Sequence, residues 1–119
     1  MYKAIKIDSK KRTFEEVEIG NGLEDIYKQV ECSMIEVATY LGTDVIYVDE
    51  EGLFGKIEYL FEVNGAHQPF VGNGLVVGTT SSGGSKSPSI TIDELKKLVT
   101  FSYGKDYKGE EESDEQANG

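Results

Sequence analysis

The sequence predicts an α+β fold in which two amphipathic helices pack on a mainly antiparallel sheet of about four to five strands. Three observations indicate this class. Apolar and polar residues alternate through the first twenty positions, an unbroken β-prone run fills Val45–Val48, and two stripes with helical spacing lie far apart in the chain. Connections such as Gly42-Thr43 are too short for a crossover helix, which favours antiparallel pairing.

The first predicted element is a β-hairpin. Tyr2–Asp8 and Thr13–Ile19 both alternate, and the polar segment Ser9–Arg12 between them has the length of a hairpin loop. The basic cluster Lys10-Lys11-Arg12 is therefore interpreted as a solvated hairpin tip.

A helix should follow the hairpin. Asn21 is a good N-cap, and Glu24 stands three residues later, where its carboxylate can reach back to the amide of the cap. The apolar positions then recur at helical spacing and form one stripe: Leu23, Ile26, Tyr27 and Val30.

Two antiparallel strands are predicted next. Met34–Leu41 and Val45–Val48 are neighbours, and the second strand is expected to be buried on both faces at the centre of the sheet. It runs into Asp49-Glu50-Glu51-Gly52, which must lie at a solvated turn, with Gly52–Gly55 closing that turn.

The segment Ile57–Val63 fits two patterns. Ile57, Leu60 and Phe61 suit a helix, whereas Tyr59, Phe61 and Val63 suit a strand, and we expect a short helix or irregular segment.

The rest of the domain is predicted as strand, loop and helix. Phe70–Thr79 reads as one buried strand flanked by glycines, and residues 80–88 read as a flexible loop. Thr91, with Glu94 at the third helical position, forms a capping box. The apolar stripe of this second helix consists of Ile92, Leu95, Leu98 and Val99.

Charge divides the chain into a globular domain at residues 1–103 and a disordered acidic tail at 104–119. The formal net charge is −10. The tail holds six acids and two lysines, a balance of −4, which leaves −6 on the domain. Such a surface repels phosphate backbones, so direct nucleic-acid binding is not expected.

The residue content also indicates a cellular compartment. Cys32 is the single cysteine, so no intrachain disulfide forms. The N-terminus lacks the apolar region of a signal peptide, and no stretch reaches the ~20 apolar residues of a membrane span. We expect a cytoplasmic protein without membrane association.

None of the glycine-rich segments matches a known catalytic or nucleotide-binding motif. The glycines of Gly83–Ser87 resemble a phosphate loop, but the lysine comes two positions late and Pro88 replaces the helix start. Gly72, Gly74 and Gly78 miss the dinucleotide spacing, so turn glycines are the better interpretation. We expect no cofactor.

The remaining polar candidates are also weak. A Cys32–His67 pair would supply a nucleophile and its base, but nothing in the sequence places the two side chains together. Asp49–Glu51 lack the twelve-residue calcium pattern and suit a solvated turn. No catalytic residue and no metal ligand is therefore predicted. The candidate binding residues are Tyr47, Asp49, Glu50, Glu51, Phe70 and Asn73.

Four segments carry a family resemblance. They are Leu23–Val30, Ile35-Glu36-Val37, Ile46–Gly52 and Gly72–Gly78. Over about residues 1–101 the chain resembles a small domain family of unknown function carried by bacteriophages, conjugative plasmids and gut bacteria of the Clostridium type. The resemblance implies mobile-element ancestry and supplies no catalytic residues. The family often has Asn where this chain has Asp49, so whatever that Asn does is altered here.

The sequence is compatible with three functions. The leading expectation is a non-enzymatic accessory protein of a phage or mobile element, whose acidic surface binds a host or element protein that normally grips nucleic acid. The alternative is a small-ligand binder of nucleotide type that uses Phe70–Gly78 and Tyr47 as a pocket. A small enzyme comes third, and requires Cys32 or His67 in a cleft beside Asp49–Glu51.

Overall fold

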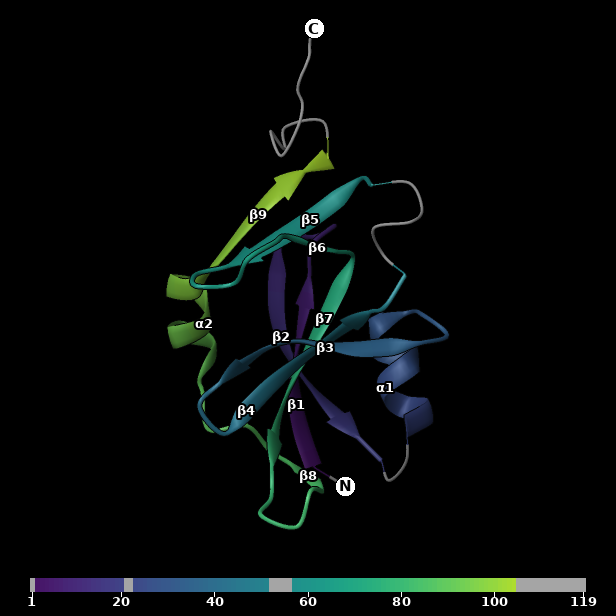
Figure 1. Ribbon diagram of the computed structural model, residues 1–119, viewed down its shortest axis with the longest axis vertical. Coiled ribbons are helices and arrows are strands. Elements are labelled where there is room, and N and C mark those ends of the chain that lie inside the picture. The colour runs from purple at the N-terminus through teal and green to yellow at the C-terminus, as the bar shows by residue number, and fades with distance from the viewer. Residues whose placement is uncertain (1, 21–22, 52–56, 105–119) are drawn as a thin grey trace, which may run out of the picture.

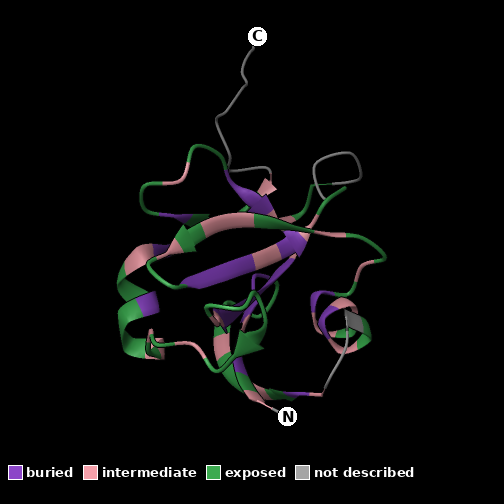
Figure 2. Ribbon diagram, turned by 60° about the horizontal axis from the view of Figure 1, so that its bottom comes forward, coloured by how far each residue is buried: buried purple, intermediate pink, exposed green. Residues whose placement is uncertain are grey.

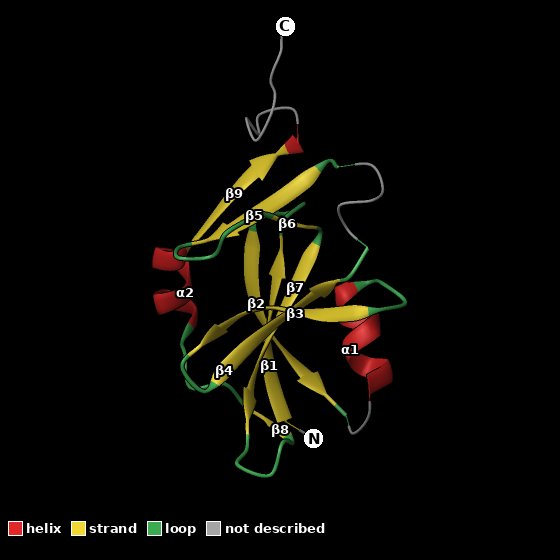
Figure 3. Ribbon diagram, in the orientation of Figure 1, coloured by secondary structure: helices red, strands yellow, loops and turns green. Residues whose placement is uncertain are grey.

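The computed structural model describes residues 2–20, 23–51 and 57–104. Within these residues the chain forms two sheets and two helices, with α1 and α2 on opposite sides of the molecule (Figures 1 and 3). The elements in chain order are β1 (Tyr2–Asp8), β2 (Thr13–Ile19), α1 (Leu23–Val30), β3 (Ile35–Leu41), β4 (Asp44–Asp49), β5 (Tyr59–Val63), β6 (Phe70–Val71), β7 (Asn73–Thr79), β8 (Ser85–Lys86), α2 (Ile92–Leu98) and β9 (Val99–Tyr103).

The larger sheet has the strand order β2-β1-β7-β4-β3, with the short β8 paired to one end of β7. All of its pairings are antiparallel, as the short connections predicted. β4 lies inside the sheet between β7 and β3, and Val45, Ile46 and Val48 are each at most 2% exposed. The α+β class is confirmed with more strands than expected, although β7, not β4, is the middle strand.

Each face of this sheet has its own core. On one face, Ile46, Val76 and their neighbours pack against the smaller sheet (order β6-β5-β9) and against Leu95 of α2. On the other face, Val45, Leu75 and Val77 pack against Ile26 and Val30 of α1. Figure 2 shows the buried strand segments between these layers. Burial on both faces explains the long apolar runs of β4 and β7.

The expectation of a helix or irregular segment at Ile57–Val63 is wrong, because Tyr59–Val63 is strand β5. It is the middle strand of the smaller sheet, paired with β6 on one side and β9 on the other. Leu60 and Phe61 are adjacent and both fully buried, which shows that both faces of β5 are covered. Adjacent apolar residues in such a strand can be mistaken for the apolar stripe of a helix.

The single strand expected at Phe70–Thr79 is two strands in two sheets. Gly72 separates β6 from β7 with a φ of +83°, a backbone region that favours glycine. The loop expected at 80–88 contains β8. Val99 is expected in the second helix, but its N–H caps α2 by donating to the Leu95 carbonyl, and it begins a further strand, β9.

Both predicted helices are confirmed in the described residues. α1 spans Leu23–Val30 as expected, and Thr91 and Glu94 form the predicted reciprocal capping box at α2. The Asn21 cap, the turn at residues 52–55 and the acidic tail from residue 105 lie outside the described residues. Neither α1 nor α2, the helices of the described segments, has the length and apolar character needed to cross a membrane.

A buried carboxylate joins the sheet to the chain that leads into α2. Asp44 is 1% exposed and begins β4. Its Oδ2 accepts hydrogen bonds from the backbone N–H groups of Ser89 and Ile90, at 3.0 and 2.8 Å, and its Oδ1 lies 3.0 Å from the Ser89 nitrogen. Charge-assisted bonds of this kind fix the start of α2 against the larger sheet.

Replacing Asp44 with alanine should lower the free energy of unfolding by about 2–3 kcal/mol, because the Ser89 and Ile90 N–H groups lose a charged acceptor. Asp44→Asn keeps one acceptor oxygen and should lose less. The matched control is Glu18→Ala at an exposed β2 position, which should stay within about 0.5 kcal/mol of the parent. Urea denaturation measures all three variants, and equal stabilities of Asp44→Ala and Glu18→Ala would refute the anchoring role.

Candidate functional site

A cavity of about 370 Å³ lies where the C-terminal end of α1 meets the β1–β2 hairpin tip and the β6–β7 junction. We call it the acidic pocket, because four of its lining residues carry carboxylates and one is a lysine. Its lining comprises Ser9, Lys10, Val30, Glu31, Asp49, Glu51, Glu58, Tyr59, Val71, Gly72 and Asn73.

Strand register brings the polar residues of this pocket together. Asp8 of β1 pairs with Asn73 of β7, and Leu75 pairs with Tyr47 on the other side of β7. Asp49 lies two residues beyond Tyr47, so it shares the α1-facing side of the sheet and lies toward Asn73. Three neighbouring strands thus end in polar side chains beside the end of α1.

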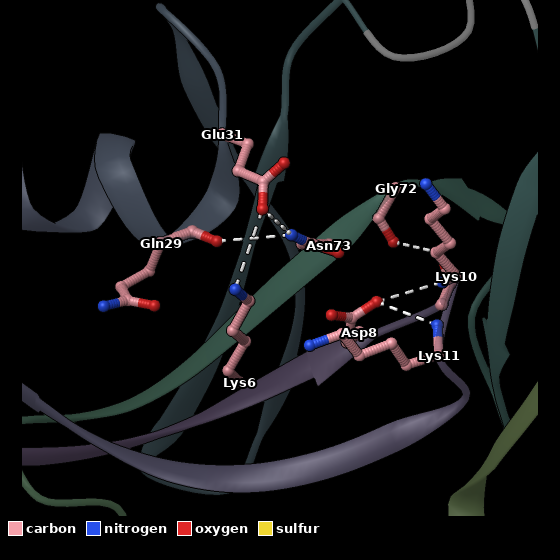
Figure 4. Close-up of polar contacts among 9 residues, drawn as sticks. Lys6, Asp8, Lys10, Lys11, Gln29, Glu31, Gly72 and Asn73 are labelled. Carbon is pink, nitrogen blue, oxygen red and sulfur yellow. Dashed lines mark hydrogen bonds and ion pairs between the residues drawn. The ribbon is translucent and has the colours of Figure 1, made fainter.

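Asn73 connects the sheet to the last turn of α1. Its side chain is 9% exposed, and its Nδ2 donates to the Gln29 carbonyl at 3.4 Å and to Glu31 Oε2 at 3.1 Å (Figure 4). The last carbonyls of a helix have no partner within the helix, so the Asn73 amide satisfies one of them. Asn73 therefore positions Glu31 at the pocket.

Glu31 adopts an unusual backbone conformation. Its φ is +64°, and the N–H groups of Glu31 and Cys32 both donate to the Tyr27 carbonyl, at 2.8 and 3.1 Å. This is the Schellman-type helix ending, in which glycine is the usual residue. The Glu31 carboxylate lies 3.7 Å from Lys6 Nζ and is 68% exposed, so the ion pair is weak and the carboxylate faces solvent.

The hairpin tip is held next to Gly72. Asp8 Oδ1 accepts hydrogen bonds from the backbone N–H groups of Lys10 and Lys11, at 3.1 and 3.0 Å, and the Ser9 hydroxyl donates to the Gly72 carbonyl (Figure 4). Lys10 is thereby fixed at the rim of the acidic pocket. Lys10, Lys11 and Arg12 are all exposed, as expected for a solvated tip.

The structure brings three of the candidate binding residues together. Asp49, Glu51 and Asn73 line the acidic pocket, and Asp49 Oδ1 accepts a hydrogen bond of 2.9 Å from the Glu51 N–H. Glu50 is exposed and is not part of the lining. Carboxylates at this turn thus point in different directions, two of them into the pocket rim.

The two aromatic candidates lie elsewhere. Phe70 is 5% exposed and packs on Phe61 in the core, with ring centroids 5.5 Å apart. Tyr47 is half-buried against the α1-side core. Burial raises the pKa of the Tyr47 hydroxyl above its usual range, and the nearby hydroxyls of Tyr2 and Tyr40 raise it further.

The cysteine and the histidine do not form a reaction centre at the pocket. Neither Cys32 nor His67 lines it, and His67 is exposed. Burial raises the pKa of the Cys32 thiol, and the Asp49 charge raises it further against a lowering hydrogen bond with the Met34 backbone. The thiol is thus protonated at neutral pH and is a poor nucleophile. Among the described residues, no group of three or more His, Cys, Asp or Glu side chains is arranged to hold a metal.

Comparison with known families identifies the class of this chain. Residues 2–100 match the family model described as Domain of unknown function (DUF3846). The match covers nearly all of the described fold, so the chain belongs to this family. No curated protein and no solved structure matches the chain.

Several residues of the acidic pocket were not singled out from the sequence. Glu31 reads as an ordinary polar residue at a helix end, Lys10 as part of a solvated hairpin tip, and Tyr59 as one of several aromatic residues that suit either the core or an interface. Only strand register and the helix ending bring them together. A charged residue at the position where glycine usually ends a helix is the one local signal that points to Glu31.

The positive φ of Glu31 has a measurable cost. Glu31→Gly and Glu31→Ala both remove the contacts with Lys6 and Asn73, but only glycine adopts this φ without strain. We expect Glu31→Gly to be more stable than Glu31→Ala by about 1 kcal/mol in chemical denaturation. If Glu31→Ala is at least as stable as Glu31→Gly, the left-handed helix ending does not exist in solution.

Proposed function

We propose that this protein is a non-enzymatic, cytoplasmic accessory protein of a phage or mobile element that acts by binding a basic host or element protein. The observation that carries the proposal is the acidic pocket, in which Glu31, Asp49, Glu51 and Glu58 outnumber the single lysine. A pocket of this charge suits lysine or arginine side chains of a partner. A protein that grips nucleic acid displays such side chains.

The geometry of the pocket supports direct contact. The Asn73 amide donates to the Glu31 carboxylate, and Asp49 accepts a hydrogen bond from the Glu51 N–H. These carboxylates are ordered before a partner arrives, so binding has less side-chain entropy to lose. The net charge of −10 adds long-range attraction and speeds encounter with a cationic partner.

The test uses fluorescein-labelled deca-lysine as a probe of the basic partner, with binding followed by fluorescence anisotropy. The full chain should bind it, and the affinity should fall steeply from 50 to 300 mM NaCl because surface charges are screened. Asp49→Asn combined with Glu51→Gln should weaken binding roughly fivefold. Asn at position 49 keeps an oxygen acceptor for the Glu51 N–H, so the turn is preserved.

The matched control removes the same charge from another surface. Glu15→Gln combined with Glu18→Gln alters two exposed carboxylates of β2, and it should change the affinity by less than about twofold. Equal losses in the two double variants would assign binding to overall charge and reject the pocket. Affinity that does not respond to salt would reject the electrostatic proposal altogether.

The second candidate function is binding of a small ligand of nucleotide type. A cavity of about 370 Å³ has the size of a small-molecule site, and Tyr59 and Asn73 offer a ring and an amide at its wall. The same carboxylates repel phosphate groups, so a base or nucleoside fits this pocket better than a nucleotide.

A thermal-shift panel of nucleosides and nucleotides separates the two functions. Under the protein-binding proposal, none of them raises the melting temperature at 1 mM. A ligand present at one hundred times its Kd would stabilise the chain by about 2.7 kcal/mol, which such a scan detects easily. A reproducible shift that is lost in Asn73→Ala would favour the small-ligand function.

A further inference from the structure

Exposed hydrophobic side chains gather on one edge of the larger sheet. Of the five large hydrophobic side chains exposed in the described residues, three belong to β3 or to the residue before it: Met34 (49% exposed), Val37 (38%) and Tyr40 (69%). We call these residues, together with the half-buried Tyr47, the β3 surface. No residue of β3 is fully buried, although five of its seven residues are hydrophobic.

Val37, Tyr40 and Tyr47 of the β3 surface lie on the side of the sheet that carries α1. Val37 pairs with Tyr47, and Tyr40 pairs with Val45, whose side chain belongs to the α1-side core. α1 packs mainly on β7 and β4, and Val37 and Tyr40 of the outer strand stay exposed. Val45 and Tyr47 are two residues apart on β4, so their partners place Tyr40 and Tyr47 on the same side of two neighbouring strands. The two tyrosine rings are therefore parts of one surface.

The two outer strands of the sheet differ in charge. β2 carries three glutamates, Glu15, Glu16 and Glu18, whereas β3 carries only Glu36. Charged side chains on an outer strand disfavour pairing with another chain, so β2 is better protected than β3. The register shift between Val37 and Thr39 interrupts the β3 edge, so a long added strand cannot pair evenly along it. Side chains are then the main contact that this surface offers.

Carboxylates flank one end of this apolar surface. Ile35, at the start of β3, pairs with Asp49, and the Glu50 N–H donates to the Met34 carbonyl at 3.0 Å. The β3 surface therefore continues into the carboxylates of the turn and, through Asp49, into the acidic pocket. A net charge of −10 disfavours a second copy of the chain as the occupant and favours a cationic partner.

We propose that the β3 surface docks an arginine-bearing segment of the basic partner. The inference rests on the proposed function, and it adds which cation the partner presents. A guanidinium group stacks on a tyrosine ring and also pairs with carboxylates, whereas an ammonium group is compact and more strongly hydrated. The chain contains this type of contact already, because the Arg12 guanidinium lies 4.2 Å from the centre of the Tyr103 ring.

The experiment compares fluorescein-labelled deca-arginine with deca-lysine by fluorescence anisotropy on the full chain at 150 mM NaCl. Deca-arginine should bind more tightly, by about two- to fivefold for one exposed ring. Tyr40→Ala should remove the preference for arginine, and Tyr40→Phe should keep it. The matched control is Tyr103→Ala, which removes an exposed ring of the smaller sheet and should leave the preference unchanged.

The outcomes separate this inference from the function on which it rests. Equal affinity for the two peptides, or a preference that survives in Tyr40→Ala, would refute arginine docking and leave salt-dependent binding of deca-lysine intact. Failure of both peptides to bind would reject the proposed function as well. Sedimentation equilibrium adds a check on the occupant: a dimer that Val37→Lys dissociates would assign the β3 surface to a second copy and overturn the inference. Circular dichroism and thermal melting establish that each variant is folded.

Discussion

The arrangement of the two sheets depends on the backbone at Gly72. The chain leaves β6 in the smaller sheet and enters β7 in the larger sheet within this one residue, at a φ of +83°. Its N–H donates to the Tyr59 carbonyl at 2.9 Å, and its carbonyl accepts from the Ser9 hydroxyl. A residue with a side chain is strained at this φ, so glycine permits the turn that takes the chain from one sheet to the other.

The acidic pocket lies at the same junction between the two sheets. Gly72 forms part of its wall, Tyr59 comes from the smaller sheet, and Asn73 begins the middle strand of the larger one. The carboxylates belong to connections, where water can solvate them, since a buried unpaired charge would be costly. The fold therefore supplies the concave shape, and the turns and helix end supply its charge.

Local signals in the sequence predicted the elements that they specify directly. The first hairpin, α1, the β3–β4 pair and the capping box of α2 all follow from neighbouring residues. β5, β9 and the break at Gly72 did not, because pairing partners far along the chain decide them. β5 contains two adjacent apolar residues that are buried on opposite faces of the strand. In the sequence alone this spacing also fits a helix, because the sequence does not show that both faces of the strand are covered.

The same limit explains which site residues were found. Asp49, Glu51 and Asn73 stand in segments whose composition is conspicuous, and they line the pocket. Glu31 and Lys10 become part of it only through strand register and a helix ending. Phe70 was a candidate because aromatic residues are enriched at interfaces, but its ring completes the core.

Val99 ends α2 and starts β9 with no residue between them. The helix cap and the first residue of the strand are therefore the same residue, and no loop separates α2 from β9. The opposite end of β9 pairs Tyr103 with Tyr59, whose side chain forms one wall of the acidic pocket. α2 and the wall of the acidic pocket are therefore connected through a single strand, β9, and its pairing with β5.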